Sequence, residues 1–562
     1  MIKLYQLIRV RNAAFMIWIG CFIWNNIAHS QAAFFIDVAK TAGIDHINMS
    51  GSAEKQYIIE TQPAGGGFWD YNNDGILDIY LTNGVPQDSI LAKTIGTALY
   101  RGEADAHFTD VTDSSDTHLT GWTMGVTFAD YDGDGDADLY ATRWGPDVLL
   151  GNNGDGTFSN HTEAAGLGSS RWGIGASFAD FDLDGDLDLY VANYIDFALS
   201  GPPFYDQWCT HNGVQSACGP VGARPQADLL YRNEGNGHFT EVSAEVGLTG
   251  PSYYAMGVLW TDYDDDGDPD LYVANDGHPN TLFRNDRQRF VDVALIESVA
   301  YSGDGRPQAG MGVAAGDYDR DGLFDLFVTN FSQDHNTLYR NSGKGYFSDV
   351  SGQANLAGTS RPHMGWGTFF FDFDSDGYED LFVANGHLMP EIEQAGIAMQ
   401  YRQPNLLYHN DGQGRFNDIS NQAGSGLKVK EVSRAAAYGD YDNDGDLDIL
   451  VVNLDAAPNL LRNDSQQNGN WLSVSLRSGG SNREGIGARV YLQTEDGRQM
   501  REVRTGTSFQ SQNDLRQHFG LAENQHADII VRWADATEQH YTSVKANRFY
   551  TIFKEDNKIT VE

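Results

Sequence analysis

The stretch Asp180–Asp188 reads D-F-D-L-D-G-D-L-D, and this acidic nonapeptide recurs seven times along the chain, always with glycine at position six. Position one is Asp70, Asp130, Asp180, Asp262, Asp317, Asp372 and Asp440. Position three is Asn72, Asp132, Asp182, Asp264, Asp319, Asp374 and Asp442. Position five is Asp74, Asp134, Asp184, Asp266, Asp321, Asp376 and Asp444. Position nine is Asp78, Asp138, Asp188, Asp270, Asp325, Asp380 and Asp448.

Carboxylates crowded into nine residues repel one another. At about 5 Å and an effective dielectric constant of about 20, each charged pair costs roughly 3 kcal/mol. A chain that repeats this arrangement seven times is therefore expected to bind a hard cation at each copy. Oxygen ligands at alternate positions, with a glycine for the sharp turn, favour Ca²⁺ over zinc or a redox metal.

Two other interpretations of the nonapeptide are an EF-hand loop and an ordinary surface turn. An EF-hand loop needs Glu at position twelve, but this position holds Leu81, Ala141, Val191, Val273, Val328, Val383 and Val451. The residues after position nine instead have the β-branched and aromatic character of strands. The other alternative is that the nonapeptides are ordinary Asp-Gly surface turns. Seven copies in register argue against it.

Composition limits the class of protein. The 562 residues include 78 acidic and 37 basic residues, which give a formal charge of −41. This charge disfavours a nucleic-acid partner, because phosphates need Lys and Arg. With 63 glycines and 12% aromatic residues, the chain is typical of turn-rich β structure. Its length predicts two or more domains or one large repeat array.

The N-terminus indicates export. Residues 1–30 combine Lys3, Arg9 and Arg11 with the apolar stretch Ala13–Trp24, a pattern typical of a signal peptide. A retained membrane anchor is the alternative. No other segment has the length and apolar character of a membrane span, so the mature chain is expected to have none. The predicted location is secreted, periplasmic or cell-surface.

Cys209 and Cys218 remain once Cys21 leaves with the signal peptide. In an exported protein, such a pair is expected to form a disulfide within a long loop. A zinc site that includes the nearby His211 is the alternative.

The spacing of the acidic loops predicts the architecture. Successive copies lie about 62 residues apart on average, a period typical of one four-stranded propeller blade. An inner strand such as Met124-Gly125-Val126 precedes each loop. The N-terminal segment Phe35–Val38 matches the outer strand Phe108–Val111. We therefore predict an all-β, seven-bladed β-propeller that is closed by an N-terminal strand, so that no sheet edge is exposed at the join.

These features resemble a known family. The blades, over about residues 33 to 463, resemble the FG-GAP (VCBS) repeats of integrin-α-type β-propellers. The segments Asn470–Leu472, Asn482–Val490 and His518–Leu521 resemble the ASPIC/UnbV domain. Together they suggest a bacterial member of the cartilage acidic protein 1-like group. The predicted domains are the signal peptide (1–30), the propeller (31–465) and a small C-terminal β-sandwich (466–562), which either docks on the propeller or mediates assembly.

The resemblance implies one Ca²⁺ per blade, up to seven in all. The side chains at positions one, three, five and nine would bind the ion together with the backbone carbonyl at position seven. Asn72 is the only neutral residue in this ligand set, so the first site is expected to bind most weakly.

We expect the calcium to be structural and the protein to be a non-enzymatic binding or adhesion protein. Its ligand, an extracellular glycan or protein, would bind the face opposite the calcium loops. The long connections on that face carry Trp122, Arg143, Trp144, Trp172, Phe204, Tyr205, Trp208, Tyr253, Tyr254, Tyr301, His387 and Tyr401. Packing against neighbouring loops is the alternative role for each. The recurring Met124, Met256, Met311 and Met364 are expected to line the channel or pack between blades.

A second function class is a calcium-dependent polysaccharide-active enzyme such as a lyase. The candidate bases and carboxylate-binding residues are His161, His278, His335, His363, His387, Arg361 and Arg402. No pair of them has a spacing that demands catalysis, and the sequence has no nucleophile elbow, H-E-x-x-H motif or phosphate-binding glycine loop. We therefore predict no catalytic residues.

Overall fold

The computed structural model describes residues 35–86, 94–199, 208–211, 213–343, 345–465 and 469–561. All of the described residues belong to one compact unit. The predicted signal peptide, residues 1–30, lies outside the described residues. Among the helices that the described ranges contain, none has the length and apolar character needed to cross a membrane.

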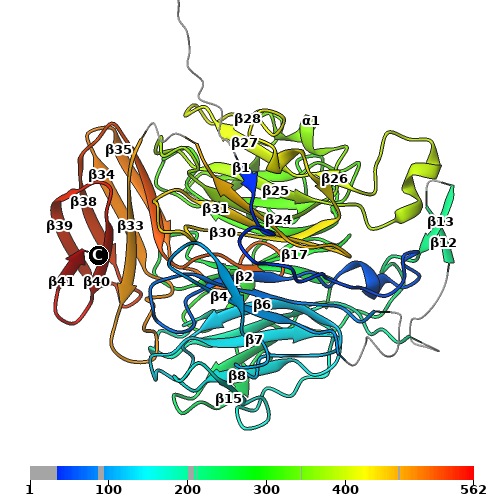
Figure 1. Ribbon diagram of the computed structural model, residues 1–562, viewed down its shortest axis with the longest axis horizontal. Coiled ribbons are helices and arrows are strands. Elements are labelled where there is room, and N and C mark those ends of the chain that lie inside the picture. The colour runs from blue at the N-terminus through cyan, green and yellow to red at the C-terminus, as the bar shows by residue number, and fades with distance from the viewer. Residues whose placement is uncertain are drawn as a thin grey trace, which may run out of the picture. The chain divides into compact units, whose positions relative to one another are not determined.

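In the described residues, seven antiparallel sheets each provide four strands in meander order (Figure 1). The first sheet contains β2 (Gly66–Trp69), β3 (Asp78–Leu81), β4 (Ala98–Gly102) and β5 (Phe108–Asp110). The second and third contain β6 (Thr123–Ala129), β7 (Asp138–Arg143), β8 (Val148–Asn152), β9 (Phe158–Asn160), and β10 (Gly173–Ala179), β11 (Asp188–Asn193), β14 (Leu229–Asn233), β15 (Phe239–Glu241). The fourth and fifth contain β16 (Ala255–Thr261), β17 (Asp270–Asn275), β18 (Thr281–Asn285), β19 (Phe290–Asp292), and β20 (Gly310–Gly316), β21 (Asp325–Asn330), β22 (Thr337–Asn341), β23 (Phe347–Asp349). The sixth and seventh contain β24 (Gly365–Phe371), β25 (Asp380–Asn385), β27 (Leu406–Asn410), β28 (Phe416–Asp418), and β30 (Ser433–Gly439), β31 (Asp448–Asn453), β32 (Asn459–Asn463), β1 (Phe35–Asp37).

The inner strands form a ring. Each contacts the next in chain order, and β30 of the seventh sheet contacts β2 of the first. The glycine of the recurring inner-strand motif makes this approach possible. A Cβ at Gly257 would lie 2.3 Å from the carbonyl oxygen of Met311, and one at Gly312 would lie 2.1 Å from that of Trp366. Only glycine fits at these two positions, because any larger residue would push neighbouring sheets apart.

Aromatic pairs join the sheets farther from the axis. The aromatic residue at position two of each acidic loop packs on the outer-strand phenylalanine of another sheet, with ring centroids 5.6 to 6.1 Å apart. The pairs are Tyr71–Phe158, Tyr131–Phe239, Phe181–Phe290, Tyr263–Phe347, Tyr318–Phe416, Phe373–Phe35 and Tyr441–Phe108.

Closure of the ring by the N-terminal strand is confirmed. Strand β1 pairs with β32 in antiparallel register, with Phe35 opposite Asn463 and Asp37 opposite Leu461. The strand therefore supplies the outermost position of the seventh sheet, as its match to Phe108–Val111 predicted. The all-β propeller fold follows from these pairings together with the ring of inner strands.

The short elements lie in the connections. They are η1 (Ile58–Thr61), α1 (Leu356–Ser360), η3 (Pro390–Ala395), η4 (Gly426–Lys428), the pair β26 (Gln403–Pro404) and β29 (Lys430–Glu431), and the hairpin β12 (Trp208–His211) and β13 (Val214–Ala217). The predicted disulfide between Cys209 and Cys218 is confirmed, with an S–S distance of 1.99 Å. It closes the β12–β13 hairpin, whose β13 contacts η3. Figure 1 shows this hairpin on the side of the ring opposite the C-terminal strands.

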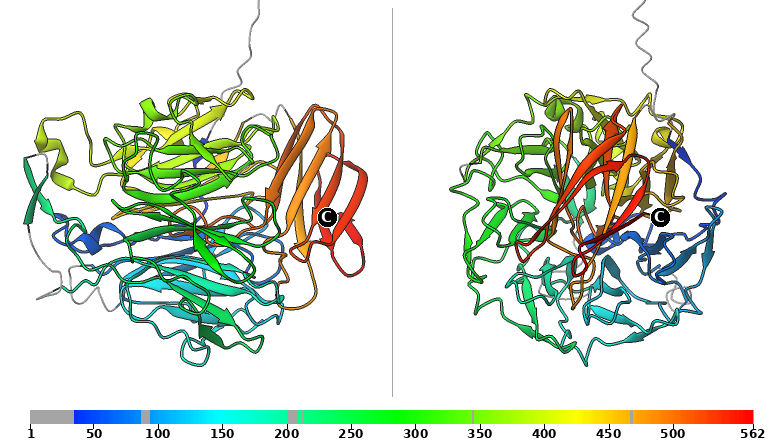
Figure 2. Two further views of the ribbon diagram at one scale, coloured as in Figure 1. Left: turned by 180° about the vertical axis from the view of Figure 1, so that it is seen from behind. Right: turned by 90° about the vertical axis from the view of Figure 1, so that its left-hand side faces the viewer.

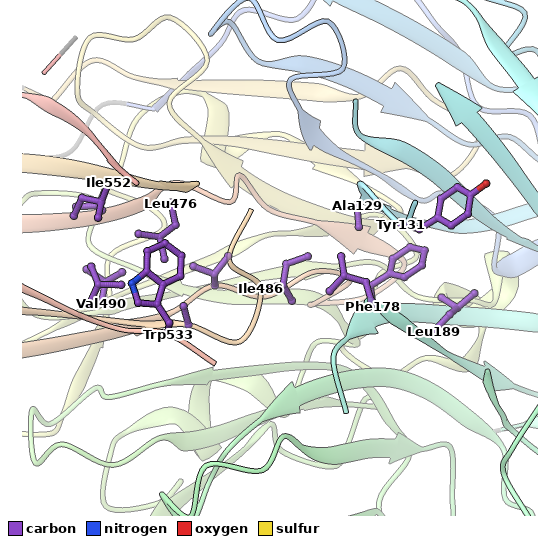
Figure 3. Close-up of a cluster of buried hydrophobic side chains, with 14 of the residues drawn as sticks. Ala129, Tyr131, Phe178, Leu189, Leu476, Ile486, Val490, Trp533 and Ile552 are labelled. Carbon is purple, nitrogen blue, oxygen red and sulfur yellow. The ribbon is translucent and has the colours of Figure 1, made fainter. Parts of the chain in front are cut away.

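The C-terminal region consists of two four-stranded sheets. One has the order β37 (Gln517–Ala522), β33 (Asn470–Arg477), β40 (Phe549–Phe553), β41 (Lys558–Val561). The other has the order β35 (Gly497–Glu502), β34 (Arg489–Thr494), β38 (His526–Arg532), β39 (Glu538–Lys545). Buried residues of both sheets form one cluster that continues into the second and third propeller sheets, where Ile486 lies between Trp533 and Phe178 (Figure 3).

A segment of the C-terminal region enters the ring. Residues 504–513, which we call the plug segment, form hydrogen bonds with all seven inner strands. Strand β36 (Ser511–Gln512), within this segment, pairs in parallel with β2. Phe509 packs with Met124, Met256, Met311 and Met364 in a single buried cluster. The methionines therefore pack around the plug inside the ring. Figure 2 shows the C-terminal strands across one face of the ring.

Candidate metal centres

Each acidic loop connects the inner strand of a sheet to its second strand and is held by its own side chains. In the third loop, the two carboxylate oxygens of Asp180 accept hydrogen bonds from the backbone N–H groups of Asp184 and Gly185, both at 3.0 Å. Asp188 accepts from Phe181 N at 3.0 Å. Asp184 Oδ1 accepts from the backbone N–H of position seven at 2.9 Å. This last bond recurs in all seven loops.

The acidic side chains converge. In the second to fifth loops, carboxylate oxygens of positions one, three and nine lie within 4.8 Å of one another. In the sixth loop, Asp374, Asp376 and His409 form such a group. His409 Nε2 lies 3.3 Å from Asp374 Oδ2, and these carboxylates raise the pKa of His409 to about 11. The third strand, β27, thus brings a histidine to this loop, which the acidic motif alone did not indicate.

Several of these oxygens are buried and lack a hydrogen-bond partner. They are Asp130 Oδ1, Asp182 Oδ1, Asp319 Oδ1, Asp325 Oδ2, Asp374 Oδ1 and Asp442 Oδ1. A buried, unpaired carboxylate oxygen is costly unless a cation compensates it. Burial raises the pKa of Asp78 to about 8 and that of Asp138 to about 9, and nearby carboxylates add to the shift. The donor set therefore fits a hard divalent cation.

An asparagine at the end of the third strand links consecutive loops, a role that the sequence analysis did not recognise. The Asn233 backbone N–H donates to Asp188 Oδ1 at 2.9 Å, and its side-chain Nδ2 donates to the carbonyl of Tyr131 in the preceding loop at 2.8 Å. The same pair of bonds is made by Asn152, Asn285, Asn341, Asn410 and Asn463. The only sequence signal was the recurrence of this asparagine.

The aromatic surface predicted on the opposite face is largely packed. Trp122, Trp172, Tyr254 and His387 are buried, so these four pack within the protein, which was the alternative role, and are not available to a ligand. Trp208 is 43% exposed. Arg143, Trp144, Tyr253, Tyr301 and Tyr401 are half-buried. Phe204 and Tyr205 lie outside the described residues.

The histidines considered for an enzyme are held by structural partners in separate sheets. His278 packs against Tyr254, with ring centroids 4.4 Å apart. His335 Nε2 lies 3.4 Å from Asp349, and Tyr131 Oη lies 3.0 Å from His161 Nδ1.

Comparison with known proteins identifies both parts of the chain. The model of the FG-GAP-like repeat matches residues 70–141, 133–191, 221–273, 262–328, 317–383 and 397–451. The ASPIC and UnbV model matches residues 478–559. Neither model describes a catalytic family.

Curated relatives from several animals are all cartilage acidic protein 1. The chain is 27% identical to cartilage acidic protein 1 of Homo sapiens over 312 residues, which cover 52% of this chain and 43% of the relative. It is 28% identical to cartilage acidic protein 1 of Xenopus tropicalis over 312 residues, which cover 53% and 44%. The match thus spans less than half the length of these relatives.

Among solved structures, an Agrocybe aegerita lectin that recognises non-reducing terminal N-acetylglucosamine is similar to 65% of this chain. The match covers 88% of the lectin at 16% identity, with a TM-score of 0.37. From the family models and the curated relatives together, the chain belongs to the FG-GAP-like repeat proteins with a C-terminal ASPIC/UnbV domain and is homologous to cartilage acidic protein 1.

Proposed function

We propose that the protein is an exported, calcium-loaded binding protein without catalytic activity, in which one Ca²⁺ per loop is structural. The observation that carries the proposal is the convergence of carboxylate oxygens, several of them buried and unpaired, at equivalent points around the ring. Ca²⁺ accepts six to eight oxygen ligands in flexible geometry, which suits loops that offer side chains at positions one, three, five and nine.

Calcium would act here by cancelling repulsion. Without an ion, the carboxylates of positions one, three and nine lie within 4.8 Å of one another in the second to fifth loops, for example Asp262, Asp264 and Asp270 of the fourth. When bound, the ion supplies the positive charge that these groups lack, and the loops can hold their strands in register. The sites are predicted to differ, since the first has the neutral Asn72 at position three.

The ligand surface is proposed on the face opposite the acidic loops. C-terminal residues already occupy several loops on the other face, and the plug segment fills the ring. The β12–β13 hairpin, closed by its disulfide, presents the exposed Trp208 on the opposite side. An exposed tryptophan among polar groups suits a glycan or a protein ligand outside the cell.

The test has two parts. Calorimetry of the mature chain with and without chelator is expected to show a melting temperature that falls when calcium is removed; an unchanged value would refute the structural role. A glycan array with the calcium-loaded protein, compared with Trp208→Ala, then examines the ligand face. Binding that is indifferent to Trp208 would contradict the assignment of this hairpin.

A further inference from the structure

Strand β37 of the C-terminal region lies on the sixth and seventh acidic loops. The backbone N–H of Ala522, at the end of β37, donates to the carbonyl of Ser375 at 2.9 Å. His518 Nε2 lies 3.0 Å from the carbonyl oxygen of Gly445. Ser375 is position four of the sixth loop and Gly445 is position six of the seventh. One strand therefore contacts the turns of two adjacent loops.

The contact is close enough to require glycine on both sides. A Cβ at Gly520 would lie 2.1 Å from Asp372 Oδ2 and 2.5 Å from the backbone of Ser375. A Cβ at Gly445, where φ is +97°, would lie 2.0 Å from the ring of Trp471. No water layer fits between surfaces at such separations, so the C-terminal strands cover Ser375 of the sixth loop and Gly445 of the seventh, while Asn443 and Asp444 of the seventh stay exposed.

Exposure distinguishes the sixth loop from the third. Ser375 is 1% exposed, whereas Leu183, at the same position of the third loop, is 40% exposed. Asp184 and Gly185 of the third loop are also exposed, while Gly377 of the sixth is buried. The two loops have the same ligand types at all four positions, so they differ in their covering and in His409 rather than in their acidic residues.

Arginines extend the contact to other loops. Arg489 lies 3.1 Å from Asp262 Oδ2, and Arg532 lies 3.2 Å from the same oxygen. Arg483 donates to the carbonyl of Gly133 in the second loop at 2.6 Å. Each guanidinium neutralises part of a loop's charge, and the C-terminal region thus contacts the second and fourth loops as well as the sixth and seventh.

We infer that the protein has two kinetic classes of cation site and that the C-terminal region is the cover that separates them. The third site is open to solvent and exchanges its ion directly. The turn of the sixth site is covered by β37, so its ion leaves more slowly until β37 lifts. Lifting is opposed by the plug segment, whose hydrogen bonds reach all seven inner strands. The inference rests on the proposed calcium binding.

The experiment is release of Ca²⁺ from the loaded full-length chain into a fluorescent chelator, followed by stopped flow. We expect a fast phase and a phase at least tenfold slower. The matched substitutions are at position five: Asp184→Asn should reduce the amplitude of the fast phase, and Asp376→Asn that of the slow phase. Gly520→Ala should convert slow release into fast release, with circular dichroism as the check on folding.

His518→Leu, which removes the contact with Gly445, replaces Gly520→Ala if the latter fails to fold, and should accelerate the slow phase by several-fold. Single-phase release from the unaltered chain, or loss of the fast phase in Asp376→Asn, would overturn the inference while leaving calcium binding intact. Elemental analysis of the starting protein measures how much calcium is bound before release. A chain without bound calcium would overturn both the proposed function and this inference.

Discussion

Gln512 is the residue of the plug segment whose loss should cost most, and the substitution that tests this is Gln512→Met. Its Oε1 accepts hydrogen bonds from Thr127 Oγ1 and Phe128 N, both at 2.8 Å, and from Gly506 N at 3.1 Å. Its Nε2 donates to the carbonyl of Phe128 at 3.1 Å. The side chain is 1% exposed. Methionine keeps the unbranched shape and removes all four bonds.

The expected cost follows from the groups left unpaired. The backbone N–H groups of Phe128 and Gly506 lose their acceptor in a buried site, and each such loss costs about 1 to 3 kcal/mol. The Thr127 hydroxyl and the Phe128 carbonyl add less, because a hydroxyl can rotate and a carbonyl tolerates partial pairing. We therefore expect a destabilisation of about 4 kcal/mol. With an unfolding entropy of about 2.1 cal/mol/K per residue, this lowers the melting temperature of the 562-residue chain by about 3 °C.

Differential scanning calorimetry of the calcium-loaded chain measures this value. The control is Gln493→Met, because Gln493 lies in the same C-terminal region but is exposed; its melting temperature should stay within about 1 °C of the original. If Gln512→Met melts like the control, the plug segment does not bind the inner strands as described. Gln512→Glu should also destabilise, since it places a charge beside the Phe128 carbonyl.

Three further outcomes are expected. Burial and Arg434 lower the pKa of His387 to about 3 from 6.5, so on acidification the unfolded chain binds a proton before the folded chain does. The free energy of unfolding therefore falls as the pH drops below about 6.5, by about 2 kcal/mol between pH 7 and pH 5. Urea unfolding measures this loss, and His387→Gln should make the free energy of unfolding depend less on pH. Asn233→Ala, which breaks the link between the second and third loops, should weaken calcium binding at both by calorimetric titration, whereas the exposed Asn236→Ala should not. Reduction of Cys209–Cys218 should expose the β12–β13 hairpin to protease at an unchanged melting temperature, because the hairpin lies outside the ring of sheets.

The sequence was sufficient for the propeller because its repeat is local. Each acidic loop carries its own hydrogen bonds, and each inner strand repeats the glycine that permits close approach, as at Gly257. A repeat in the sequence therefore predicts a repeated four-stranded sheet in the structure. Even the displaced strand was predictable, since Phe35–Asp37 repeats the outer-strand pattern and pairs where that pattern requires.

Long-range contacts between unlike parts of the chain could not be predicted in the same way. The plug segment was not predicted, because residues such as Thr505 and Gln512 have no repeat and no charge pattern that marks a partner hundreds of residues away. The aromatic residues showed the same limit. Trp172 and Trp208 both lie in loops of the opposite face, yet the first is 1% and the second 43% exposed.

The plug segment links the C-terminal region to the whole ring of sheets that carries the acidic loops. A ring of sheets held only by contacts between neighbours can open at any join. The plug segment bonds to every inner strand, and β37 and three arginines reach the loops from the same side. Separation of the C-terminal region would therefore break contacts with all seven sheets together.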